Sequence, residues 1–102
     1  MNRNKKINDK QSKHLQCKLR VVGQRHGIVE ESTPYYLSLF EGKKRLVGPQ
    51  YAVNITDLGS LVANTLLENK DRGDVRLQLK GSFYESGEQM IRDIVKLHNS
   101  RV

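Results

Sequence analysis

The chain of 102 residues is 36% hydrophobic and 28% charged, which suits a single small globular domain with one modest core. It has no run of about 18 apolar residues, so no membrane-spanning helix is expected, and the basic N-terminus is not followed by the apolar segment of a secretory signal. A single cysteine, Cys17, excludes an internal disulfide and a cysteine-based zinc site and favours a reducing, cytoplasmic location.

The net charge of +7 is distributed unevenly along the chain. Residues 1–14 hold five basic residues against one acidic residue, and the remainder carries a net charge of only +3. Because the segment is polar and has no hydrophobic periodicity, it predicts a disordered basic tail ahead of one domain over residues 15–102. Such a tail can serve solubility alone, or it can add contacts to phosphate groups.

Alternation of apolar and polar residues predicts three strands in the first half of the domain. The first spans residues 15–22 and ends at Gly23, and a loop follows up to Pro34. The second covers residues 35–41 and, after a tight turn at 42–44, the third covers residues 45–56, with a bulge or kink at Gly48-Pro49. The order indicates an antiparallel meander. The apolar row expected for the third strand is Tyr51, Val53 and Ile55.

Residues 56–69 form the one clear helix of the sequence. Thr56 or Asp57 is suited to cap its first turn, and Gly73 follows a charged stretch after its end. Because the helix is short and has one apolar face, it is expected to cover one opening or flank of a sheet. The apolar stripe, at the spacing of an amphipathic helix, is Leu58, Leu61, Val62, Thr65 and Leu66.

A fourth strand is predicted where Val75, Leu77 and Leu79 alternate with basic and polar residues. Ser86-Gly87 can form a two-residue hairpin turn, which would lead to a fifth strand over residues 89–97. A helix remains an alternative for this segment, because its apolar spacing also fits a helical period and Ser86 with Gln89 could form a capping box. We expect the strand, since β-branched residues are frequent and the fourth strand needs a partner.

Three strands, a short helix and two further strands follow the order of an OB-fold, and residues 15–98 resemble that superfamily. Residues 58–97 look most like single-stranded-DNA-binding proteins, with a short helix, "GDV" at the start of a strand, "KGSF" at its end, and a hairpin. The hairpin is shorter than in bacterial members, and the sequence lacks their long acidic-tipped C-terminal tail. The resemblance implies a mainly β protein, a five-stranded barrel with one short helix between strands 3 and 4.

The resemblance also implies a face that binds single-stranded nucleic acid across the second and third strands. Residues that alternate outward meet both physical requirements, because cations attract phosphates and flat aromatic rings stack on unpaired bases. Outward aromatics can also pack under a loop, and a basic row can be only a solvated face. The candidate binding residues are Lys18, Arg20, Tyr36, Phe40, Lys43, Lys44, Arg45, Arg76, Lys80 and Tyr84.

Motifs for catalysis are missing from the sequence. The three histidines lack the spacing of metal ligands, and neither a Walker-type phosphate loop nor a nucleophile elbow is present. We therefore expect no metal site, no cofactor and no enzyme activity. The expected partner is single-stranded DNA, ahead of RNA, in replication, repair or recombination. A homo-oligomer is expected, in the cytoplasm and associated with the nucleoid if the partner is DNA.

The alternative is a protein-interaction module, an OB-type subunit that docks on a larger partner and binds nucleic acid poorly. A helix in the last segment would favour this alternative, because it would offer Ile91, Ile94 and Leu97 to a partner helix. The apolar interface patch would consist of Tyr36, Phe40 and Tyr84.

Overall fold

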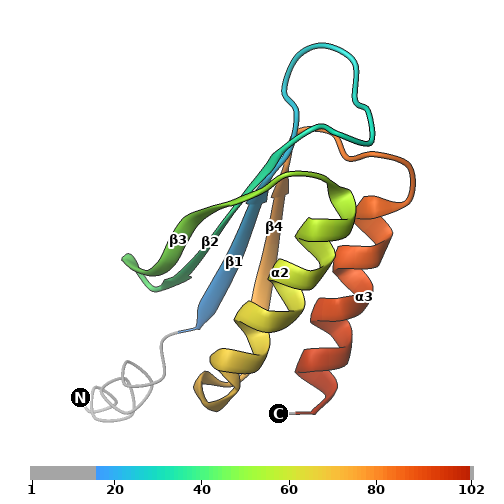
Figure 1. The fold of residues 1–102 in the computed structure, drawn as a ribbon. Helices are drawn as coiled ribbons and strands as arrows, with labels where there is room; N and C mark the ends of the chain where they lie inside the picture. Colours follow the sequence, from blue (N-terminus) through green and yellow to red (C-terminus); the bar gives the residue numbers. More distant parts are fainter. Residues whose placement is uncertain (1–15, 102) are drawn as a thin grey trace, which may run out of the picture.

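Two helices cover one face of a four-stranded mixed sheet (Figure 1). The computed structural model describes residues 16–101, so the predicted basic tail lies outside the described residues. Within this range, no helix is both long and apolar enough to cross a membrane. The elements in chain order are β1 (Cys17–Val22), β2 (Tyr35–Glu41), β3 (Lys44–Ala52), α2 (Ile55–Glu68), the 3₁₀ helix η1 (Lys70–Arg72), β4 (Val75–Lys80) and α3 (Gly87–Ser100).

The strands lie in the order β3-β2-β1-β4. β1, β2 and β3 form the antiparallel meander that the sequence predicts, whereas β4 runs parallel to β1, with Leu77 opposite Leu19. Because α2 connects β3 to β4, the chain crosses over the sheet before it adds the last strand. The β2–β3 pairing shifts register twice. The first shift lies between Leu37 and Leu39, opposite Gly48 and Pro49, where the sequence predicts a bulge, and the second lies between Leu39 and Phe40.

The predicted five-stranded OB-fold barrel is wrong. The sheet is open, since β3 and β4 each pair with one neighbour only, and the last segment is helix α3 rather than a fifth strand. A strand would have placed Asp93 on the same face as Ile91 and Val95, whereas the helix buries those two residues and turns Asp93 to solvent. The capping box considered with the helix alternative does not form, because the side chain of Ser86 at the N-cap makes no hydrogen bond to the helix.

The hydrophobic core lies between the sheet and the two helices. Every second residue of β1 points into it, and α2 contributes about one residue per turn. Cys17 is buried here, and burial, together with the nearby Glu41 carboxylate, raises the pKa of its thiol. The buried hydrophobic residues are Cys17, Leu19, Val21, Tyr35, Leu37, Leu39, Ala52, Leu58, Val62, Leu66, Val75, Ile91 and Val95.

Helix α2 begins one residue earlier than the sequence predicts and has a different cap. The side-chain oxygen of Asn54 accepts a hydrogen bond from the Asp57 backbone N–H at 2.7 Å. The Asp57 carboxylate in turn accepts one from the Val53 N–H at 3.1 Å. Thr56 and Asp57, the predicted caps, therefore lie inside the helix, and the two bonds fix the turn that leads from β3 into α2.

Side-chain hydrogen bonds fasten both ends of α3 to the sheet. At its start, the Tyr35 hydroxyl accepts a hydrogen bond from the Tyr84 N–H at 3.0 Å, and the Tyr35 ring stacks on Phe83 with centroids 5.3 Å apart. At its end, Asn99 accepts from the Val75 N–H at 2.7 Å and donates to the Val75 carbonyl at 2.9 Å. These contacts hold α3 on the same side as α2 and leave the other face of the sheet uncovered.

Candidate nucleic-acid interface

The face of the sheet that the helices leave uncovered, here called the open face, carries a regular array of basic and aromatic side chains. Strand alternation decides which side chains point to it, and the pairing of the strands arranges them in three rows. The first row holds Arg45, Phe40, Lys18 and Arg76; the middle row holds Ser38, Arg20 and Gln78; the third row holds Tyr51, Tyr36, Val22 and Lys80.

The first row is built around one aromatic ring between two cations. The Nζ atom of Lys18 lies 5.7 Å from the centroid of the Phe40 ring, and the Cζ atom of Arg45 lies 5.2 Å from it. Cation–π contacts of this kind contribute about 0.5–1 kcal/mol each at exposed sites. They hold a flat guanidinium and a flat ring together, and both groups can stack on a base.

The third row carries two exposed tyrosines. The rings of Tyr36 and Tyr51 have centroids 5.5 Å apart and are tilted by 59°, and the two residues are 47% and 55% exposed. Tyr51 was not among the predicted binding residues, because the sequence pattern placed it in the apolar row of the third strand. The β2–β3 pairing has two register shifts, one on each side of Leu39, and they cancel between Arg45 and Tyr51. Both residues therefore lie on the open face, where Tyr51 pairs with Tyr36, and Ala52 is buried.

A hollow of about 350 Å³ lies at the middle row, between the two aromatic rows. Three arginines from three different segments line it: Arg20 from β1, Arg45 from β3, and Arg25 from the loop that follows β1. The Nε atom of Arg20 is buried and makes no hydrogen bond to another residue of 16–101. The lining of this arginine pocket is completed by Val22, Tyr36, Ser38 and Pro49.

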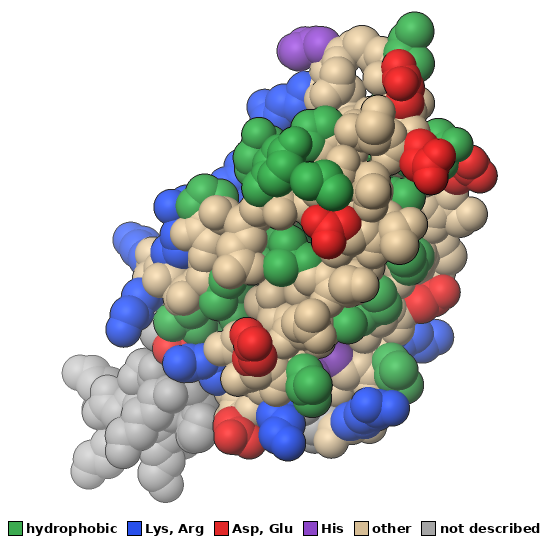
Figure 2. Space-filling model, viewed as in Figure 1, with side chains coloured by type: hydrophobic (Ala, Val, Ile, Leu, Met, Phe, Trp, Pro, Cys, Tyr) green, Lys and Arg blue, Asp and Glu red, His purple; other side chains and the backbone are tan. Residues whose placement is uncertain are grey.

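The charge of the open face has one sign. No outward strand position of the three rows is acidic. Among residues 16–101 the ion pairs are Arg72 with Glu41, at 3.4 Å, and Arg92 with Glu88, at 2.9 Å, and neither involves a cation of the three rows. In Figure 2, which views the molecule from the helix side, Lys and Arg side chains gather along the left margin beside the sheet. Within residues 16–101 the outward strand positions of the open face are therefore positive, and their cations form no ion pair with a carboxylate. The cations of the open face are Lys18, Arg20, Arg45, Arg76 and Lys80.

Seven of the ten candidate binding residues come together on the open face, and three do not. Lys43 lies in the turn at the tip of the β2–β3 hairpin, and Lys44 pairs with Glu41, whose side of the sheet faces the helices. Tyr84 lies in the loop before α3, where the carboxylate of Glu85 accepts its hydrogen bond and raises the pKa of the phenol. The other seven residues share one face although the predicted barrel is wrong, because their orientation depends on alternation and pairing within the strands.

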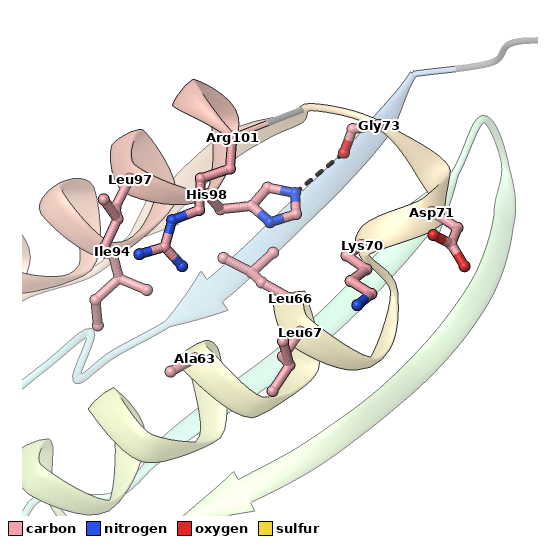
Figure 3. A pocket seen from close by; sticks show the side chains of 10 residues that line it. All are labelled: Ala63, Leu66, Leu67, Lys70, Asp71, Gly73, Ile94, Leu97, His98 and Arg101. Atoms are coloured by element: carbon pink, nitrogen blue, oxygen red, sulfur yellow. Dashed lines mark hydrogen bonds between the residues drawn. The ribbon is translucent and has the colours of Figure 1, made fainter.

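A second hollow, of about 760 Å³, lies between the C-terminal ends of the two helices (Figure 3). Gly59 and Gly87 bring α2 and α3 close together near their starts, and the helices separate toward their ends. The exposed side chains of Leu67 and Leu97 border this helix groove. Its remaining lining is Ala63, Leu66, Lys70, Asp71, Gly73, Ile94, His98 and Arg101.

Comparison with protein families, with curated proteins and with solved structures finds no match for this chain. Within residues 16–101, no three His, Cys, Asp or Glu side chains are placed to hold a metal ion. The geometry and charge of the open face and of the helix groove are therefore the features that indicate a function.

Proposed function

We propose that this protein is a non-catalytic binder of single-stranded nucleic acid that lays the strand across the open face. The observation that carries the proposal is the combination of five cations and three aromatic rings on the open face, whose strand positions in the described part of the chain include no carboxylate. Cations attract the phosphates and rings accept the bases, and each stacked base contributes about 1–3 kcal/mol.

The spacing of the rings favours an unpaired strand over a duplex. Phe40 and Tyr36 are four residues apart on β2, which corresponds to about 13 Å at the rise of a β-strand. Consecutive stacked bases of a duplex are about 3.4 Å apart and hide their flat faces from a protein. A spread single strand can place separate bases on the two aromatic rows, whereas a duplex would meet this face only through its phosphates.

The expected preference for DNA depended on the resemblance to OB-fold proteins, which the open sheet does not support. A four-stranded sheet whose aromatic side chains stack two or three bases is a common way to bind single-stranded RNA. The proposal therefore covers single-stranded DNA and RNA. A role in replication, repair or recombination, and a place in the cytoplasm or on the nucleoid, belong to the DNA form of the proposal.

A titration with labelled single strands tests the proposal. We would follow fluorescence anisotropy of a dT and a U oligonucleotide with the full-length chain at several salt concentrations. Binding is expected to weaken as salt rises, with a slope near −0.7 for each phosphate contacted. The control is a chain in which the five basic residues of 1–14 are replaced by Gln. If this variant no longer binds, the tail rather than the open face makes the contact.

A second candidate function is docking of a protein partner in the helix groove. The observation that favours it is that residues 87–100 are helical and expose Leu97 beside Leu67, which are 54% and 64% exposed. Lys70 and Arg101 at its border suit a partner that combines apolar side chains with a carboxylate. Leu67→Asp should abolish capture of such a partner and leave nucleic-acid binding unchanged, and Tyr36→Ala should do the reverse.

A further inference from the structure

The arginine pocket brings together cations from three separate segments of the chain. Arg20, Arg25 and Arg45 line the same hollow, although they come from β1, the following loop and β3. The other lining groups with hydrogen-bonding side chains are Tyr36 and Ser38. Three like charges that line one hollow repel one another, and an anion bound among them is stabilised.

The side chain of Arg20 lies at the centre of the open face and is partly buried. It stands in the middle row, with Ser38 on β2 and Gln78 on β4 directly opposite. Its Nε atom is buried and makes no hydrogen bond within residues 16–101, so this donor is available to an anion in the pocket. A planar guanidinium has paired N–H groups that match two oxygens of a phosphate, which makes phosphate the anion that suits this pocket best.

The neighbours of the pocket indicate where such a phosphate comes from. Phe40 lies on one side, in the first row, and Tyr36 with Tyr51 on the other, in the third row. A strand whose bases stack on both aromatic rows must carry its backbone across the middle row. We infer that the arginine pocket holds one phosphate of the bound strand and so fixes the strand's register on the sheet, an inference that depends on the proposed function.

The phosphate can be an internal diester or a terminal monoester, and the first experiment tests their shared chemistry. Full-length ¹⁵N-labelled protein is titrated with inorganic phosphate at constant ionic strength, with chloride as the reference salt. We expect saturable shifts at the backbone amides of Arg20 and Ser38. Arg20→Met, which keeps most of the aliphatic stem, should weaken phosphate binding about tenfold or more, equivalent to about 1.4 kcal/mol.

Arg76→Met is the matched control, because Arg76 lies on the same face but outside the pocket. It should leave the affinity for inorganic phosphate unchanged. Equal losses in Arg20→Met and Arg76→Met would overturn the inference, as would shifts spread evenly over the open face. Arg20→Lys keeps the charge but loses the paired N–H groups of the guanidinium. An affinity for phosphate equal to that of the wild type would show that no bidentate phosphate site exists. Circular dichroism verifies that each variant is folded.

Short oligonucleotides distinguish a terminal phosphate from an internal one, and they test the phosphate pocket separately from the proposed binding of single strands. A dT hexamer with and without a 5′-phosphate is titrated against wild type, Arg20→Met and Arg76→Met. Tighter binding of the phosphorylated hexamer, lost only in Arg20→Met, identifies a terminal phosphate, and equal binding of both hexamers identifies an internal one. If both hexamers bind and Arg20→Met loses no more than Arg76→Met, the inference fails and the proposed function stands. If phosphate fills the pocket but no hexamer binds, the proposed function fails and the pocket holds a free phosphate compound.

Discussion

Tyr36 and Tyr51 are the residues from which we expect most of the stacking energy. Both rings are about half exposed, and cross-strand pairing keeps them together in the third row of the open face. Phe40 in the first row is flanked by Lys18 and Arg45. A base can therefore reach the tyrosine rings directly, whereas at Phe40 it must stack beside a cation that already contacts the ring.

Replacement of Tyr36 or Tyr51 by Ala should lower the affinity for a single strand by about 5- to 150-fold, the equivalent of about 1–3 kcal/mol per stacked base. Because both side chains are exposed, thermal unfolding should change little. Anisotropy titration measures the affinity. The matched control is Tyr84→Ala, which removes a tyrosine that lies off the open face. A loss of affinity in Tyr84→Ala as large as in Tyr36→Ala would place the site elsewhere.

The buried thiol of Cys17 gives a prediction about pH. Burial raises its pKa above the ordinary value of 9.0, so the folded protein holds the thiol proton more tightly than the unfolded chain does. Stability is therefore unaffected below pH 9.0 and falls as the pH rises through the raised pKa. Alkylation by iodoacetamide at pH 8 should be slow in the native protein and fast in urea. Rapid native alkylation would mean that Cys17 is accessible.

At the scale of the elements, the sequence predicted β1, β2, β4 and α2 closely, because each depends on a local pattern. The predicted fifth strand was wrong because the apolar residues of this segment fit both the period of a strand and that of a helix. Only the helix turns the charged side chain of Asp93 to solvent while it buries Ile91 and Val95. The predicted face of Tyr51 was wrong, because β3 contains two register shifts that cancel and leave Tyr51 on the same face as Arg45. The parallel pairing of β1 with β4 is a contact between distant segments, and no local pattern reports it.

Two substitutions in α3 distinguish the helix from the predicted strand. In the helix Ile91 is fully buried and Leu97 is 54% exposed, whereas in a strand the two would share one face. Ile91→Ala should reduce the free energy of unfolding by about 2–5 kcal/mol. Leu97→Ala should change it by about 0.5 kcal/mol or less. Urea denaturation measures both, and equal losses would contradict the assignment of α3.

Two glycines should respond oppositely to the same substitution. A Cβ atom on Gly23 would lie 2.3 Å from the Ser82 carbonyl oxygen, where β1 and the segment after β4 meet, so Gly23→Ala should cost about 1–3 kcal/mol. A Cβ atom on Gly59 would lie 3.0 Å from the flexible Met90 side chain, and Ala is favoured over Gly within a helix by about 1 kcal/mol. Gly59→Ala should therefore unfold at a similar or higher urea concentration than the wild type. A Gly23→Ala variant as stable as the wild type would contradict the close approach at Ser82.

At the scale of the whole molecule, charge and shape divide the protein into two sides. The helices cover one side of the sheet and leave a groove between their ends (Figure 1). The opposite side is the open face, which has cations in all three rows. Binding on one side therefore depends on where the cations lie more than on the net charge of +7. A strand attracted by net charge alone would bind either side equally.

The most direct measurement compares two variants of equal net charge. One replaces Lys18, Arg45, Arg76 and Lys80 of the open face by Gln, and the other replaces Lys70, Arg92, Lys96 and Arg101 of the helix side by Gln. Anisotropy titration of a labelled single strand at two salt concentrations gives the affinity and its salt slope for each variant. We expect the first variant to lose about 100-fold or more in affinity and most of its salt slope. The affinity and salt slope of the second variant should stay close to those of the wild type. Equal losses in the two variants, or no loss in the first, would contradict binding on the open face.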